Sequence, residues 1–319
     1  MIRIILLLPA WKRCVASAVV ASGTLARWSA RGDRLAGNAS PDEGILRPLF
    51  EWPGKDLPIA ALSRQFDAGD AAGSLWMRAD PAHVRADMST ARMLACGELG
   101  LSIAECRSIE RDLKPLFGDA GFEFDACRTD RWYLRAAKGS ELPHAASPDD
   151  AIGDDLKLHL PQGPAGKRWR QLFNEAQIAL HNHPVNAGRI ARGAIGVNSL
   201  WFWGAGALPD YVRTQLRSTS SNRPEMRALA GLAGIESLPL GQRTIADSVE
   251  SPGSDGSVVL DLVDLRDRVL EEEWLLPLDR AMARRRVESI DLRFASGEHV
   301  VIRHSHRLRF WRRVDELGS

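Results

Sequence analysis

The chain has 319 residues, of which 45% are hydrophobic and 26% are charged, and its formal net charge is +1. This length predicts two lobes or one large domain with an insertion, and the composition is that of an ordinary globular protein. The near-zero charge argues against a global field that would attract nucleic acid or anionic lipid. The cysteines form no CxxC pair, which argues against a zinc ribbon or a thioredoxin-like site and favours reduced, structural thiols.

The N-terminal segment Ile2–Pro9 is apolar and is followed by Lys12 and Arg13. In a secretory signal the basic residues precede the apolar run, and a membrane-spanning helix needs about 20 apolar residues. We therefore expect Ile2–Leu8 to be a buried strand of a cytoplasmic protein, with an export or anchor signal as the alternative. A helix over Lys12–Ser29 is expected to follow this strand.

Apolar periodicity and turn residues predict helices and strands in alternation along the chain. After a loop over Arg31–Ala60, the first half is expected to contain a strand over Leu75–Arg78 that passes into a loop around Pro81, a helix that the capping box at Ser102 begins and that ends near Phe117, and a strand pair at Phe122–Phe124 and Arg131–Arg135. The second half is expected to contain helices Arg168–Leu180, Pro184–Arg192 and Glu225–Ile235, strands Val197–Trp203 and Val258–Val263, an irregular segment Leu208–Asn222, a helix Leu265–Arg285 interrupted near Pro277, and a hairpin over Ile290–Ile302. This alternation predicts an α/β protein.

Polar side chains are concentrated in the HNHPVN turn between the two predicted helices that precede Gly193. His181 and His183 face the same side only in extended chain, and they are compatible with a metal ion, with an anion or substrate, or with structural hydrogen bonds. Asn186 and Arg189 lie three residues apart and therefore on one side of a helix. The start of that helix with Arg189 is suited to a phosphate or a carboxylate.

A second concentration of charge is the RADPAHVRAD segment, in which Arg78, Asp80, His83, Arg85 and Asp87 alternate basic and acidic groups. One interpretation is a loop that neutralises itself through salt bridges. The functional interpretation is that two arginines face an anionic ligand and that the aspartates orient them.

The common catalytic signatures are missing from the sequence. No GxSxG, HExxH or GxxxxGK[ST] motif occurs, and Gly204-Ala-Gly206 lacks the third glycine of a dinucleotide fingerprint. Asp261, Asp264 and Asp267 recur every three residues, a spacing that permits a metal cluster but is more typical of a helix. The basic tail HSHRLRFWRR is a weak signal for nucleic acid.

The segments WRQLFNEAQIALHNHPVNAGRIARGAIGVNSLWFWGAG, LWMRADPAHVRAD and RWYLRA closely resemble a bacterial family named regulatory proteins of RpfE type, which are loosely labelled phosphoglycerate mutases. The resemblance covers most of the chain and is strongest over Leu75–Pro209. The chain is also distantly similar to archaeal-type cofactor-independent phosphoglycerate mutases, which carry an Arg-containing strand, an RWYLR-like strand, HPVN, Arg, Gly, Asn and a Trp/Gly-rich end in the same order. In those mutases the region forms the substrate-binding insertion of an alkaline-phosphatase-type core.

The departure from the mutase pattern lies in the metal ligands. Those enzymes hold a nucleophilic Ser or Thr against two divalent metals with Asp and His ligands, the first of which follows the first strand as Asp-Gly. Here Ile2–Leu8 is followed by Pro9-Ala10-Trp11, and the later ligand motifs have no counterpart after Pro209. Because two metals polarise phosphoryl oxygens and activate the nucleophile, we expect no phosphoglycerate mutase activity.

The resemblance thus implies an α/β fold with a reduced alkaline-phosphatase-like core over 1–74 and 210–319 and an α+β insertion lobe over 75–209. The implied role is non-catalytic, either regulatory or metabolite-sensing; the alternatives are a metal-dependent cofactor-independent phosphoglycerate mutase or phosphatase, and a protein-interaction module without a ligand. We expect no cofactor (a divalent metal only under the enzyme alternative), a small anionic metabolite and a protein as partners, and neither nucleic acid nor membrane. The implied ligand-binding residues are Arg78, Asp80, His83, Arg85, His181, His183, Asn186, Arg189, Asn198, Trp203 and Gly204. Of these, Arg78, Arg85, His183, Asn186 and Arg189 are expected to converge in one cleft, with Trp203 and Gly204 near its rim.

Overall fold

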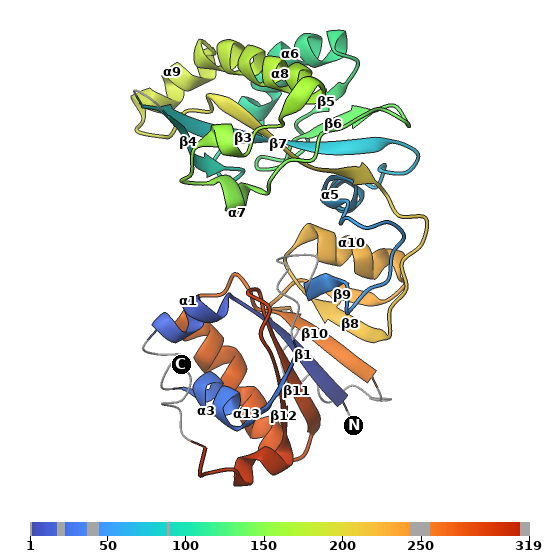
Figure 1. Cartoon of the computed structure of the whole chain (residues 1–319). Helices are drawn as coiled ribbons and strands as arrows, with labels where there is room; N and C mark the ends of the chain where they lie inside the picture. Colours follow the sequence, from blue (N-terminus) through green and yellow to red (C-terminus); the bar gives the residue numbers. More distant parts are fainter. Residues whose placement is uncertain (1, 18–22, 37–44, 88–89, 243–255, 313–319) are drawn as a thin grey trace. The chain divides into compact units, whose positions relative to one another are not determined.

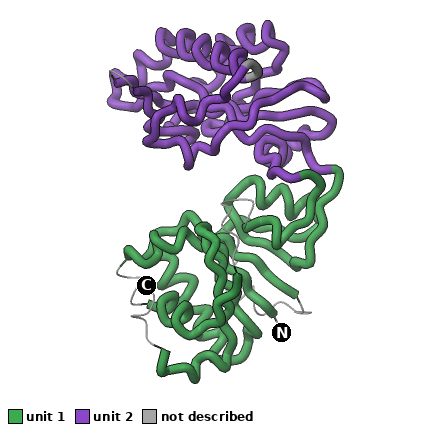
Figure 2. Tube along the Cα trace, viewed as in Figure 1, with its two compact units in different colours: residues 1–54, 210–319 green, residues 55–209 purple. Residues whose placement is uncertain are grey.

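The computed structural model describes residues 2–17, 23–36, 45–87, 90–242 and 256–312. The chain forms two compact units, shown in different colours in Figure 2: unit 1 is Met1–Gly54 with Asp210–Ser319, and unit 2 is Lys55–Pro209. Unit 2 is therefore one continuous insertion into unit 1. It begins earlier than the lobe expected at residue 75, because helix α5 (Ile59–Ala68) packs on two strands of unit 2.

Unit 1 is built on a seven-stranded sheet with the strand order β2-β12-β11-β1-β10-β8-β9. Its strands are β1 (Ile2–Leu8), β2 (Asp33–Leu35), β8 (Leu216–Ser220), β9 (Glu236–Leu238), β10 (Gly256–Asp261), β11 (Val287–Phe294) and β12 (His299–Arg303). The five strands from β11 to β9 pair in parallel, whereas β12 and β2 complete the sheet in antiparallel orientation. Strand β1 is an almost continuous apolar run with six buried residues, as expected for a parallel strand covered on both faces.

The helical segments of unit 1 are α1 (Trp11–Ala16), α3 (Thr24–Arg31), α10 (Pro224–Leu232), α12 (Asp267–Val269), the π-helical segment η2 (Leu270–Leu275), α13 (Leu276–Ala283) and the 3-10 helix η3 (His304–Leu308). Helices α1, α3 and α13, together with the segment η2, cover one face of the unit 1 sheet through an apolar core. Trp28, Leu278 and Met282 from α3 and α13 pack with Leu6 and Leu292 of the sheet. The helix expected over Lys12–Ser29 is present as α1 and α3, and its residues 18–22 lie outside the described ranges.

Unit 2 is an antiparallel sheet with helices on both faces. Its strands follow the order β4-β3-β6-β5, with β7 paired to the free side of β3. They are β3 (Leu75–Ala86), β4 (Ala91–Cys96), β5 (Glu123–Asp125), β6 (Tyr133–Ala136) and β7 (Ser199–Ala207), and the remaining helical segments are α6 (Ile103–Asp119), α7 (Pro148–Ala151), η1 (Leu156–Leu158), α8 (Gly163–His181) and α9 (Pro184–Ala191). In Figure 1, α6 and α8 lie over one face and α5 lies on the other.

Alternation along β3 divides the two faces of this sheet. Met77 and Ala79 join the large core under α6 and α8. In this core the ring of Phe117 stacks on that of Phe124, with a centroid distance of 5.1 Å. Trp76 points to the opposite face and packs with Tyr133 against α5. Any side chain at an even position in this part of β3 therefore faces α5 rather than α6.

The expected loop around Pro81 is wrong, because β3 continues through the proline to Ala86. Strand β6 pairs with β3 only as far as Arg78, and β4 begins to pair at Ala82. Pro81 lies in the gap between these two partners, where a missing N–H donor disrupts no ladder on that side. The sequence pattern could not show this gap, since it depends on where two other strands end.

Most other elements agree with the sequence. The predicted α/β class, the first strand, the capping box of α6, the helices α8 and α9, and the β11–β12 hairpin are confirmed. The irregular segment expected over Leu208–Asn222 is wrong in part, because it contains β8, whose Ser- and Thr-rich sequence has no apolar pattern. Within the described ranges, no helix combines the length and the apolarity needed to cross a bilayer.

Candidate functional site

The structure does not bring the predicted site residues into one cleft. Arg78 lies on the α5 face of the unit 2 sheet, where its Nη1 is 3.4 Å from Ser63 Oγ. Arg189 bonds instead to the loop before α6 and to Glu105, on the other side of the sheet. The expectation that Arg78 and Arg189 converge is therefore wrong, and Arg85 and His181 are simply exposed.

The polar residues of the HPVN turn are bonded to the chain itself. His183 is the N-cap of α9 and accepts the Val185 N–H through Nδ1 at 3.2 Å, and its Nε2 lies 3.1 Å from Asp112. Asn186 donates to the carbonyls of Leu180 (2.6 Å) and Val197 (2.8 Å) and accepts the Val197 N–H at 2.8 Å. Each amide atom thus replaces a backbone partner that the turn lacks, a structural role that residue type alone does not reveal.

Arg189 ties α9 to the start of α6. The side chain is fully buried, and its guanidinium donates to Ile195 O at 2.8 Å, to Gly100 O at 3.2 Å and to Leu99 O. Glu105, the capping-box residue of α6, lies 3.3 Å away. This planar group donates to three carbonyl oxygens and one carboxylate of the chain itself, whereas the sequence suggested a phosphate or a carboxylate ligand as its partner.

Three further predicted residues contact backbone segments or α5 within unit 2. The Asn198 side chain pairs with the N–H and C=O of Val84, both at 2.7 Å, and His83 Nδ1 lies 2.8 Å from Gly196 O. Gly204 has a φ of +66°, and a Cβ at this position would lie 3.1 Å from the Cβ of Ile59 in α5. These residues position backbone segments; whether any of them also contacts a ligand stays a prediction.

The Arg78, Asp80 and Trp203 side chains do come together, beneath α5. Arg78 donates to Asp80 through Nε and Nη2, both at 2.8 Å, and the Trp203 indole donates to Asp80 at 2.7 Å. The Trp132 N–H adds a fourth donor at 3.2 Å. Burial raises the pKa of Asp80, against the stabilising effect of Arg78 and the other donors on the carboxylate. The pair is almost wholly buried, so it orders this face of the sheet.

A charge network that the sequence did not reveal fixes α5 to this face. Asp67 of α5 accepts two hydrogen bonds from Arg131, at 2.8 and 2.9 Å, and one from the Tyr133 hydroxyl at 2.7 Å. Although burial acts to raise it, these donors lower the pKa of Asp67. Arg64 of α5 pairs with Asp70 at 2.5 Å and with Asp125. Asp125 and Arg131 lie more than 60 residues away from their partners in α5, so these contacts leave no spacing signal in the sequence.

In an open parallel sheet, ligands usually bind at the edge where the strands have their carboxyl ends, which we call the carboxyl edge. Here Asp261, the last residue of β10, accepts the Ser221 hydroxyl at 2.6 Å and Arg223 Nε at 2.7 Å. The Arg223 N–H also donates to Ser221 Oγ at 3.0 Å. Asp261 is buried, whereas Asp264 is exposed, and among the residues described no three His, Cys, Asp or Glu side chains form a group that could hold a metal.

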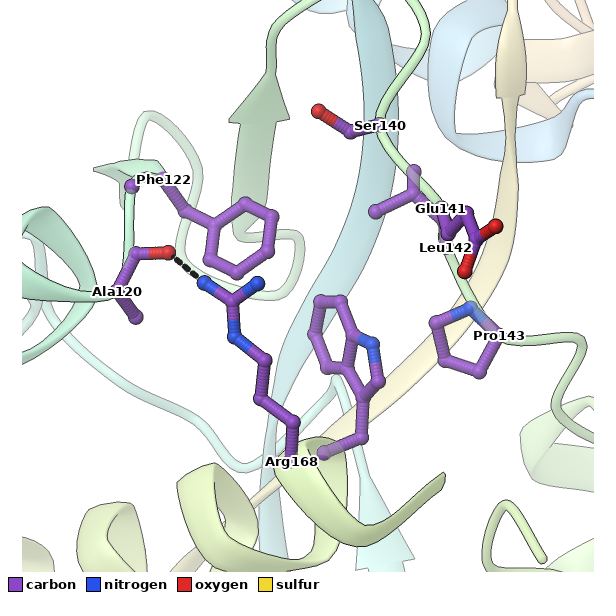
Figure 3. A pocket seen from close by; sticks show the side chains of 9 residues that line it. Ala120, Phe122, Ser140, Glu141, Leu142, Pro143 and Arg168 are labelled. Carbon is purple, nitrogen blue, oxygen red and sulfur yellow. Dashed lines mark hydrogen bonds between the residues drawn. The ribbon is translucent and has the colours of Figure 1, made fainter. Parts of the chain in front are cut away.

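A cavity of about 860 Å³ opens in unit 2 between the end of α6, the start of α8 and the loop that follows β6 (Figure 3). Its lining residues are Ala120, Gly121, Phe122, Ser140, Glu141, Leu142, Pro143, Arg168 and Trp169. The rings of Phe122 and Trp169 lie 5.0 Å apart, and the Arg168 guanidinium lies over Phe122 at 5.2 Å. One nitrogen of Arg168 donates to Ala120 O. The cavity combines an aromatic wall with one basic and one acidic side chain, and sequence analysis did not select it.

The comparisons with known proteins point to one enzyme class. A probable 2,3-bisphosphoglycerate-independent phosphoglycerate mutase of Geobacter sulfurreducens is 30% identical over 109 residues, which are 34% of this chain and 27% of that protein. The corresponding mutase of Methanosarcina barkeri is 38% identical over 64 residues, 20% of this chain and 16% of that protein. The matches thus span about a quarter or less of each relative. No protein-family profile matches the chain.

Among solved structures, the cofactor-independent phosphoglycerate mutase of Thermoplasma acidophilum aligns with 94% of this chain and 89% of that chain, at 16% identity and a TM-score of 0.42. A Pyrococcus horikoshii protein aligns with 95% and 87% at 12% identity and a TM-score of 0.47. The sequence matches support the expected distant similarity to cofactor-independent phosphoglycerate mutases.

Proposed function

We propose that this chain is a non-catalytic regulatory protein of RpfE type, derived from a phosphoglycerate-mutase-like ancestor, which senses a small anionic metabolite. The observation that carries the proposal is the unit 2 cavity with Arg168 on its wall. Its volume of about 860 Å³ lies within the roughly 300–1,000 Å³ typical of small-molecule sites. We assign the ligand-binding role to the exposed Arg168 and not to Arg189, whose side chain is buried.

The lining of the cavity defines the ligand chemistry. Arg168 presents a planar fork that suits a carboxylate or a phosphate, and only one of its nitrogens donates a hydrogen bond to a described residue. Phe122 and Trp169 offer an apolar surface to the body of the ligand. Glu141 on the loop opposite disfavours a second negative charge. A small molecule with one anionic group on an apolar body satisfies all three features.

The carboxyl edge of unit 1 supports the non-catalytic part of the proposal. In two-metal chemistry, carboxylates hold the cations that polarise phosphoryl oxygens. Here Asp261 already accepts a guanidinium and a hydroxyl from the chain itself. Both of these groups bond to Oδ2, so a metal-dependent mutase or phosphatase, the main alternative, would have to place its metal ion on Asp261 beside the paired Arg223.

A thermal-shift series tests the binding proposal. The probes are phenyl phosphate and 3-phosphoglycerate, with phenol and glycerol as uncharged controls. Phenyl phosphate is expected to raise the melting temperature, since a ligand at 100 times its Kd adds about 2.7 kcal/mol. Arg168→Gln should weaken binding about tenfold or more, the scale of a lost charge-assisted hydrogen bond. Lys167→Gln, an exposed neighbour on α8, is the matched control and should bind like the wild type.

Four outcomes contradict parts of the proposal. Equal shifts in wild type and Arg168→Gln place the anion elsewhere, and no shift with any anionic probe favours an interaction module without ligand. Glu141→Gln should bind the anion more tightly, so weaker binding would also contradict the assigned geometry. Turnover of 3-phosphoglycerate with Mn²⁺, abolished by EDTA, would establish the enzyme alternative.

A further inference from the structure

Three large apolar side chains project into solvent at one end of unit 1. Leu308, Phe310 and Trp311 are 71%, 76% and 65% exposed, and the rings of Phe310 and Trp311 contact each other edge to face at 5.5 Å. Leu308 is the last residue of η3, the 3-10 helix after β12, and Phe310 and Trp311 follow this helix. Isolated exposed apolar residues are ordinary, but three within four positions form a patch that needs a partner.

Side-chain hydrogen bonds of two arginines hold the backbone of this patch against residues 31–33. Arg309 donates to Arg31 O at 3.0 Å and to Asp33 at 2.7 Å, and Arg312 donates to Gly32 O at 3.2 Å. Both acceptor segments lie at the end of α3 and the start of β2. Phe310 and Trp311 are therefore presented between two anchored arginines.

The surroundings of the patch are strongly basic, although the whole chain has a net charge of only +1. The arginines of this region are Arg27, Arg31, Arg303, Arg307, Arg309 and Arg312, and the carboxylates that pair with them are Asp33 and Asp279. His306 is buried here, and burial together with Arg309 lowers its pKa, so the imidazole adds no charge at neutral pH. The local excess of positive charge is a feature that the net charge conceals.

A small cavity lies within this basic region. It measures about 50 Å³ and is lined by Arg27, Trp28, Arg31, Asp279, Ile302, His306 and Arg307. At about 30 Å³ for each water molecule in the liquid, this volume is in the size range of one tetrahedral oxyanion. Arg307 donates no side-chain hydrogen bond to any residue that the structure describes, and Arg27 is 3.5 Å from Asp279.

We propose that this basic–aromatic patch docks on an anionic phospholipid surface. Headgroup phosphates contact Arg31 and Arg307, and Leu308, Phe310 and Trp311 enter the interface. Arginine and lysine beside exposed Trp, Phe and Leu are the composition of interfacial anchors. Single-stranded nucleic acid would use the arginines and the rings, but Leu308 has no ring on which a base could stack.

This surface was not expected from the sequence. The expectation of no membrane partner rested on the net charge and on the missing membrane-spanning segment, neither of which tests for a peripheral surface. The basic tail was visible in the sequence, whereas the arginines of α3 and the exposure of the three apolar side chains required the structure.

Vesicle co-sedimentation of the full chain tests the proposal. Binding is expected to vesicles of phosphatidylglycerol mixed with phosphatidylcholine, to decrease with added salt, and to be weak on phosphatidylcholine alone. Arg307→Gln should weaken binding about fivefold, the equivalent of about 1 kcal/mol for one basic residue at the surface. The double variant Phe310→Ser, Trp311→Ser should reduce it about tenfold or more, because both rings leave the interface.

Controls match each variant in exposure and chemistry. Arg213→Gln removes an exposed arginine that precedes β8, four strands away from β12 in the sheet order of unit 1. Ile178→Ser with Ile190→Ser removes two apolar side chains of unit 2 that are each 68% exposed. All of these should bind vesicles like the wild type, and thermal melts should show every variant folded. Glycerol phosphate serves as a soluble headgroup mimic and should not displace the protein from vesicles.

Several results would overturn the proposal. Equal binding to neutral and anionic vesicles, or unchanged binding of both patch variants, removes the lipid surface. Complete displacement by glycerol phosphate assigns the cavity to a free phosphate. The patch is assigned to nucleic acid if the wild type binds a fluorescent single-stranded oligonucleotide but no vesicles, and the patch variants lose this binding. It is assigned to self-association if the wild type is a dimer and the patch variants are not.

Discussion

Replacement of Arg189 by lysine should destabilise unit 2 without needing any ligand. Lysine keeps the positive charge but has no planar fork. It cannot reproduce the bonds from Arg189 to Ile195 O at 2.8 Å and to the carbonyls of Leu99 and Gly100. A lysine ammonium could reach one of these three carbonyls, and the other two, at about 1–3 kcal/mol each, give a loss of roughly 2–6 kcal/mol.

Thermal and urea unfolding followed by tryptophan fluorescence measure this loss. For a unit of this size about 1 kcal/mol shifts the melting temperature by roughly 2–4 °C, so the expected decrease in the transition of unit 2 is roughly 4–24 °C. Arg192→Lys is the control, because Arg192 pairs with the same Glu105 from a side chain that is 54% exposed. It should change stability by about 0–1 kcal/mol. If both variants melt together with the wild type, Arg189 does not hold α9 to α6.

Three further outcomes follow from single sites. Burial acts to raise the pKa of Glu105, but the Ser102 N–H and two arginines hold it at about 2, below its usual 4.5. The ionised carboxylate therefore stabilises the fold fully above pH about 4.5, and this contribution is lost as the pH falls toward 2. Urea titrations should show this decrease in the wild type and a smaller one in Glu105→Gln. Gly32→Ala should cost about 1–3 kcal/mol, because the new Cβ would lie 3.0 Å from a carbonyl oxygen and against two side chains of β12, whereas Gly231→Ala in α10 meets nothing within 4 Å and should stabilise by about 0.5–1 kcal/mol; a reversed order in thermal melts contradicts this packing. Trp203→Phe removes the 2.7 Å donor of the buried carboxylate beneath α5 and should cost about 1–3 kcal/mol in urea unfolding, so an unchanged midpoint refutes that contact.

Local patterns in the sequence predicted the elements that depend on local physics. The apolar stripe of α8 and the capping box at Ser102 are formed within one helix, and both are confirmed. The path of β3 through Pro81 depends on where β6 and β4 stop, so it could not be read from the proline itself. Strand β8 could not be recognised from an apolar alternation, because its consecutive Ser218, Thr219 and Ser220 are all buried in the structure.

The candidate site was harder to predict for a related reason. Residue type showed that Asn186 and Arg189 have strong hydrogen-bonding groups, but it could not show whether a ligand or the backbone satisfies them. The Val197 and Leu99 partners are 11 and 90 residues away. The cavity beside Arg168 was missed because its walls come from three segments that share no motif.

The central claim is that a small anion binds beside Arg168. Isothermal titration of phenyl phosphate into metal-free wild type and Arg168→Gln tests it most directly. The account predicts saturable binding to the wild type and binding weakened about tenfold or more in the variant. Equal affinity in the two proteins, or binding that appears only after a divalent metal is added, would contradict it.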